Sequence, residues 1–109
     1  MQINRTRGDT YPDVFTVTNT STKALVNLTG CTFLMTLNSV RNPVDSATQV
    51  YQVTGVVTDP ATGEVYFSPT EEQADQAGFF YYDVQMTDSY GAITTLMKDV
   101  YFYSESITK

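Results

Sequence analysis

Apolar and polar residues alternate along most of this chain, and that period of two is the feature that most constrains its fold. The alternation is clearest over residues 79–88, where Phe80, Tyr82, Val84 and Met86 fall on one side of an extended strand. Similar segments cover residues 14–19, 24–28, 32–38, 49–58, 65–67 and 92–104. Gly, Pro, Asn and Asp separate them at intervals of about ten residues, which is typical of an antiparallel β-sandwich or barrel.

One segment carries a helical signal instead. Over residues 68–78, Ser68 can cap a helix, Pro69 suits the first helical position, Glu71 completes a capping box and Gly78 can end the helix. A segment of this length permits about one to three turns. We therefore expect one short helix at a corner between strands.

The size and composition fit a single core. The chain has 109 residues, of which 41% are hydrophobic and 13% aromatic, enough for one ordinary domain. Threonine occurs 18 times, and its β-branched side chain suits a half-buried strand. These features predict one all-β domain over residues 1–109.

The charge balance restricts the partners. The chain has six Lys and Arg residues and twelve Asp and Glu residues, which gives a net charge of −6. Binding to nucleic acid or to an anionic membrane requires clustered cations, so we expect neither partner. No apolar run approaches the ~20 residues of a membrane span, and residues 1–5 are not typical of a signal peptide.

The residue types needed for most catalytic sites are missing. The chain has no histidine, and its one cysteine, Cys31, cannot form an intramolecular disulfide. The carboxylates show no spacing typical of a catalytic pair or of a Ca²⁺ site with about six oxygen ligands. We expect a non-enzymatic protein without a metal or another cofactor.

Several aromatic residues do not fit a single core face. Phe79 and Tyr81 lie on the side of their strand opposite the main apolar row, and Tyr101 and Tyr103 lie in a strand whose register is ambiguous. Exposed aromatic residues on a surface with few charges are typical of protein interfaces. These four residues are therefore our candidate partner-binding residues; the alternative is that they form a second core layer, which we favour for Tyr101 and Tyr103.

The segment Gly78-Phe79-Phe80-Tyr81-Tyr82-Asp83-Val84 resembles the start of strand F in immunoglobulin-like domains. Over nearly its full length the chain is similar to the N-terminal immunoglobulin-like domain of the phage baseplate upper protein family. The other segments that carry this resemblance are, in order, Arg7-Gly8-Asp9-Thr10, Val26-Asn27-Leu28-Thr29-Gly30, Asp59-Pro60-Ala61-Thr62-Gly63-Glu64-Val65, Pro69-Thr70 and Gly91-Ala92-Ile93-Thr94-Thr95.

The sequence departs from that family in two places. Asp99 stands where relatives often have glycine, and we expect no fibre or coiled-coil segment after Lys109. The relatives use this domain to hold a longer receptor-binding arm on a baseplate. We therefore expect this chain to act through its own surface.

The resemblance implies an immunoglobulin-like antiparallel β-sandwich of about seven to eight strands with one short corner helix. It also implies a structural protein of a tailed-phage virion, made in the bacterial host cytoplasm and repeated by the symmetry of the particle. The expected partners are other virion proteins of the tail or baseplate, or the major capsid protein. The arm over residues 1–7 or the edge of the last strand could extend a neighbour's sheet.

Two alternatives remain open. A domain of this size could be a capsid decoration (cement) protein of the phage head. It could also be a module that binds host-surface saccharide through tyrosines and nearby carboxylates.

Overall fold

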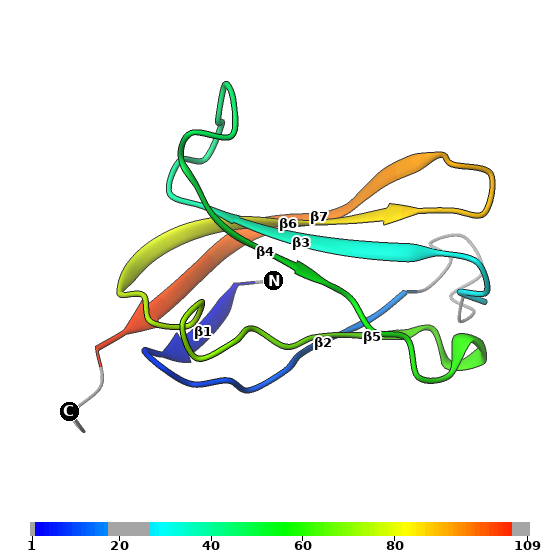
Figure 1. The fold of residues 1–109 in the computed structure, drawn as a ribbon, viewed down its shortest axis with the longest axis horizontal. Helices are drawn as coiled ribbons and strands as arrows, with labels where there is room; N and C mark the ends of the chain where they lie inside the picture. The colour runs from blue at the N-terminus through cyan, green and yellow to red at the C-terminus, as the bar shows by residue number, and fades with distance from the viewer. Residues whose placement is uncertain (1, 18–26, 106–109) are drawn as a thin grey trace.

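The computed structural model describes residues 2–17 and 27–105 (Figure 1). Its strands are β1 (Ile3–Thr6), β2 (Asp13–Thr16), β3 (Thr32–Asn38), β4 (Gln49–Thr54), β5 (Glu64–Phe67), β6 (Gly78–Thr87) and β7 (Ile93–Ser104), with a 3-10 turn, η1 (Pro60–Thr62). The chain is an all-β protein, as its period-two pattern predicts. The strand expected over residues 24–28 lies mostly outside the described residues.

The strands form two layers. A five-stranded sheet has the order β1-β7-β6-β3-β4, and β2 and β5 form a small second sheet that lies against one of its faces (Figure 1). The order β7-β6-β3-β4 corresponds to the G-F-C-C′ order of a variable-type immunoglobulin sheet. The result is a β-sandwich with one large and one small layer.

The large sheet is mixed, whereas the sequence predicted an antiparallel one. Its β3, β4, β6 and β7 pair antiparallel, but β1 pairs parallel with β7 over Tyr101–Ser104. No tight turn joins β1 to β7, so chain connectivity does not dictate their relative direction. Strand β1 pairs with β7 of the same chain only over Tyr101–Ser104, so the expected extension of a neighbour's sheet by residues 1–7 or by the edge of β7 stays a prediction.

The core lies between the two layers. Phe15 of β2 and Phe67 of β5 meet edge to face, with ring centroids 5.6 Å apart, against the inner face of the large sheet. The buried hydrophobic residues are Ile3, Phe15, Leu28, Phe33, Met35, Leu37, Tyr51, Val53, Val65, Phe67, Ala74, Tyr82, Val84, Tyr101 and Tyr103. In the strands these residues follow the period of two, so the alternation in the sequence reports the inner face of each sheet.

At Gly55 the chain passes from the large sheet to the small one. Strand β4 ends at Thr54, and Val56 then forms a bridge with Tyr66 of β5. A Cβ atom at position 55 would lie 2.7 Å from both Phe33 Cβ and Val65 Cγ2. Only glycine therefore fits this close crossing without displacing core side chains.

The expected corner helix over residues 68–78 is not formed. Residues 71–74 make a single turn, in which the Ala74 N–H donates to the Thr70 carbonyl at 2.9 Å. The reciprocal capping bonds join Thr70 and Gln73, rather than Ser68 and Glu71. Gly78, expected to end the helix, is the first residue of β6. The only helical element in the described residues is η1, in the hairpin loop before β5.

A buried polar cluster ties the two layers together. The Asp13 carboxylate of β2 is 2% exposed; it accepts a hydrogen bond from the Tyr101 hydroxyl of β7 at 2.7 Å and pairs with Arg5 of β1. Next to it, the hydroxyls of Tyr51 and Tyr103 are 2.8 Å apart. Burial raises the pKa of Asp13, while the Tyr101 hydrogen bond and the Arg5 charge act in the opposite direction. A buried carboxylate is tolerated here because its oxygens have partners.

Candidate functional site

The outer face of the large sheet carries a cluster of aromatic side chains. Phe79 of β6 is the cross-strand partner of Phe102 of β7, and their ring centroids lie 4.5 Å apart. The next cross-strand pair on this face is Tyr81 with Val100. We call Phe79, Tyr81, Val100 and Phe102 the aromatic patch. Phe79 is 65% exposed, and the other three are half-buried.

Two of the four candidate partner-binding residues lie in the core instead, which confirms the alternative that the sequence favours for them. Tyr101 and Tyr103 are 0% and 1% exposed and belong to the core, so neither side chain is available on the surface. Phe79 and Tyr81 lie on the outer face. Phe102, which is not among the four candidates, completes the patch, because it lies between two inward-facing tyrosines in an alternating strand. Only the cross-strand pairing of Phe79 with Phe102 identifies Phe102 as a surface residue, and this pairing depends on the strand register, which the sequence does not give.

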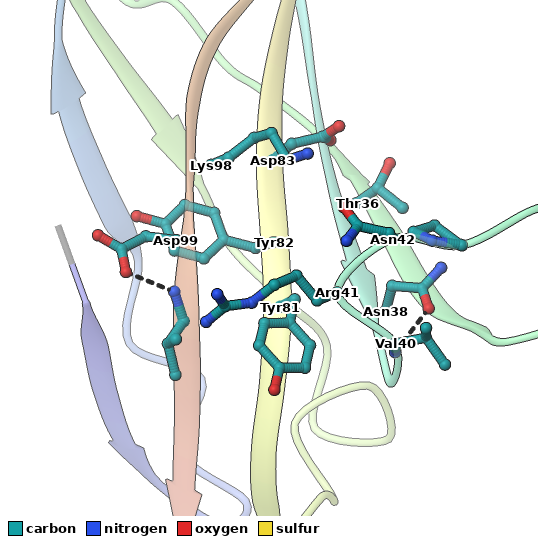
Figure 2. A pocket seen from close by; sticks show the side chains of 12 residues that line it. Thr36, Asn38, Val40, Arg41, Asn42, Tyr81, Tyr82, Asp83, Lys98 and Asp99 are labelled. Atoms are coloured by element: carbon teal, nitrogen blue, oxygen red, sulfur yellow. Dashed lines mark hydrogen bonds between the residues drawn. The ribbon is translucent and has the colours of Figure 1, made fainter.

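A pocket of about 410 Å³ lies on the same face and shares Tyr81 and Val100 with the aromatic patch. Its floor includes two cross-strand rows of outward side chains from β3, β6 and β7, and its wall is the loop over residues 40–43 (Figure 2). We call this space the sheet pocket. One floor row is Asn38, Tyr81 and Val100, and the other is Thr36, Asp83 and Lys98.

Ionic groups of both signs line the sheet pocket. The Arg41 guanidinium carbon lies 5.2 Å from the centre of the Tyr81 ring, a cation–π distance. Burial raises the pKa of Asp83, and the neighbouring charge of Lys98 partly offsets this effect. Together with Asp99, the lining holds two cations and two carboxylates, so its formal charge is close to zero.

One amide in the sheet pocket is held in a fixed orientation. The Asn38 side-chain oxygen accepts hydrogen bonds from the Val40 backbone N–H at 2.9 Å and from the Thr48 hydroxyl at 2.7 Å. Asn38 is also only 8% exposed. Its side-chain nitrogen therefore points away from these partners.

Neither a metal-binding cluster nor a membrane-spanning helix is found in residues 2–17 and 27–105. These residues contain no group of three or more Cys, Asp or Glu side chains that could hold a metal ion. In the same part of the chain, no helix is long and apolar enough to span a bilayer. Arg7, in the first segment of the family resemblance, is engaged by Asp75 at 2.6 Å and Glu105 at 3.1 Å.

No protein-family model matches the chain, and no curated protein is significantly similar to it. The proposed relation to phage baseplate proteins therefore rests on the ordered sequence segments. Several of these segments build turns. Residues 59–65 contain η1 and its hairpin, and residues 91–95 lead into β7.

Proposed function

We propose that the protein is a non-enzymatic docking module of a tailed-phage virion, located on the tail or baseplate, and that the aromatic patch contacts its partner. The observation that carries this proposal is Phe79, which is 65% exposed and whose ring lies tilted against that of Phe102. An exposed phenylalanine gains little from folding, whereas it can bury a large apolar area against another protein.

The geometry of the patch suits binding with little reorganisation. The Phe79 and Phe102 rings already contact one another, and both project from paired strands rather than from a loop. Side chains held in this way lose less conformational entropy when a partner covers them. Aromatic anchors of this kind commonly account for much of the binding energy at an interface.

The sequence resemblance supplies the class of partner. It favours other virion proteins of the tail or baseplate, with this domain repeated by the symmetry of the particle. The same patch would serve a capsid decoration protein, for which the partner is the major capsid protein. The proposal includes neither a nucleic-acid nor a membrane partner, in keeping with the net charge of −6.

The test is the binding of Phe79→Ala to particles of the encoding phage that were produced without this protein. Loss of an interface anchor costs about 2 kcal/mol or more, so we expect affinity to fall at least about thirtyfold. The matched control is Tyr90→Ala, which removes an aromatic ring that is 95% exposed in the hairpin between β6 and β7. Thermal unfolding should show that both variants keep the fold.

Immunogold labelling of complete particles then locates the domain. Gold on the tail or baseplate supports the proposal, whereas gold on the head favours the decoration protein. Equal binding of Phe79→Ala and Tyr90→Ala would remove the aromatic patch from the interface. Absence of the protein from purified particles would contradict both placements.

A further inference from the structure

We propose that the sheet pocket binds one uncharged saccharide unit, a function separate from docking through the aromatic patch. The pocket combines groups that donate and accept hydrogen bonds, an aromatic ring and a volume of about 410 Å³. That volume falls within the range of about 300–1,000 Å³ that is usual for small-molecule sites.

The polar side chains on the pocket floor have hydrogen-bonding capacity that the described chain does not use. Within residues 2–17 and 27–105, neither the Asp83 carboxylate nor the Lys98 ammonium makes a side-chain hydrogen bond or a close ion pair. They are cross-strand partners on β6 and β7, so they present an acceptor and a donor side by side. Neighbouring hydroxyls on a sugar ring can donate to the carboxylate and accept from the ammonium.

The opposite end of the floor adds a preset donor. Both hydrogen bonds to Asn38 use its side-chain oxygen, so the NH₂ group of this pocket-lining residue has no hydrogen-bond partner among the described residues. Because the Asn38 side chain is already ordered, a ligand hydroxyl that accepts from it incurs little cost in side-chain entropy. Asn42, on the wall above, brings a second amide to the same space (Figure 2).

The charges favour an uncharged ligand over an anion. Arg41 and Lys98 would attract a carboxylate or phosphate, but Asp83 and Asp99 line the same pocket and repel it. A polyhydroxylated ring can use donors and acceptors of both signs at once. The Arg41 guanidinium lies over the Tyr81 ring, so on that face the pocket presents a cation, which can donate hydrogen bonds to the ligand's hydroxyl groups.

This inference and the proposed docking function can fail separately. Docking depends on Phe79, which does not line the sheet pocket, whereas saccharide binding depends on Asp83, which lies outside the aromatic patch. Asp83→Asn is the informative variant, because it keeps the size of the side chain and replaces one acceptor oxygen with a donor. Gln85→Ala is the matched control, since Gln85 lies two residues along β6 on the same face and outside the pocket.

The experiment titrates the ¹⁵N-labelled full chain with the methyl glycosides of glucose, galactose, mannose and N-acetylglucosamine, and with glucuronate as the anionic probe. We expect saturable shifts of the Asn38 and Asn42 side-chain amide signals with at least one uncharged sugar. The dissociation constant should lie in the millimolar range, as suits a small open site. Asp83→Asn should weaken binding about tenfold, and Gln85→Ala should leave it unchanged.

Three results would overturn the inference. The first is the absence of saturable shifts at about 50 mM of every uncharged sugar, a concentration well above millimolar dissociation constants. The second is tighter binding of glucuronate, which would identify an anion site instead. The third is equal binding by Asp83→Asn and Gln85→Ala, which would place the sugar elsewhere on the surface.

Discussion

Tyr101→Phe tests whether the buried Asp13 carboxylate depends on its hydrogen bond from Tyr101. The Tyr101 side chain is fully buried, and its hydroxyl donates to Asp13 Oδ2 at 2.7 Å. Phenylalanine fills the same ring volume, so the substitution removes the hydrogen bond without opening a large cavity. One oxygen of a carboxylate that is 2% exposed then loses its partner.

The expected loss follows from the charge on the acceptor. Hydrogen bonds to charged groups contribute about 1.5–3 kcal/mol, and we take about 2 kcal/mol for this one. The entropy of unfolding is about 2.1 cal/mol/K per residue, which gives about 0.23 kcal/mol/K for 109 residues. Tyr101→Phe should therefore lower Tm by about 9 °C.

Tyr103→Phe is the matched control, because its hydroxyl lies 2.8 Å from the hydroxyl of Tyr51 and the pair is uncharged. A bond between neutral groups contributes about 1 kcal/mol, so Tm should fall by about 4 °C. Thermal unfolding followed by circular dichroism at neutral pH measures both variants.

The pH dependence gives a second readout. Burial raises the pKa of Asp13, and the hydrogen bond from Tyr101 counteracts that rise. Without this bond, the pKa in the folded state should rise further. The penalty of Tyr101→Phe is then largest where Asp13 is ionised and shrinks as pH falls through its folded-state pKa. Equal losses for the two variants, or a penalty that does not change with pH, would refute the charge-assisted bond.

Two further perturbations test the packing and the buried tyrosines. Gly55→Ala places a Cβ 2.7 Å from Phe33 Cβ and Val65 Cγ2, so urea unfolding should show a loss of about 1–3 kcal/mol. The exposed Thr54→Ala is the control, and an equal loss in both would contradict the close crossing. Burial also raises the pKa of Tyr51, Tyr82, Tyr101 and Tyr103 above the usual value of about 10. These hydroxyls ionise more readily in the unfolded chain than in the folded one. Their contribution to the free energy of unfolding is therefore complete below about pH 10. Above that pH, and up to the folded-state pKa, it declines by about 1.4 kcal/mol per pH unit for each residue. Urea midpoints that stay constant from about pH 9 to 11 would contradict this expectation.

The aromatic patch could be predicted only in part from the sequence. On β6, alternation alone separates the outward Phe79 and Tyr81 from the inward Tyr82, because the polar Asp83 and Gln85 mark the outer face. On β7, apolar residues occur at both registers, so the pattern could not decide between Tyr101 and Phe102. The pairing of β7 with β6 and β1 makes that decision.

The corner over residues 68–78 shows a limit of local signals. Thr70 and Gln73 form a capping box in the structure, so the local chemistry does favour the start of a helix. Only one turn forms, because Ala74 is buried in the core and β6 begins at Gly78. Long-range packing ends this helical turn, and capping residues carry no information about that packing.

What the sequence alone determines is the all-β class and, in β3 and β6, which side chains face inward, because alternation is a local property of extended backbone. The parallel pairing of β1 with β7, the crossing at Gly55 and the Asp13–Tyr101 contact join residues that lie far apart in the chain. The sheet pocket likewise needs β3, β6, β7 and the loop over residues 40–43 at once. Only the tertiary structure decides these features, since strand order and register depend on which strands meet rather than on the residues within each strand.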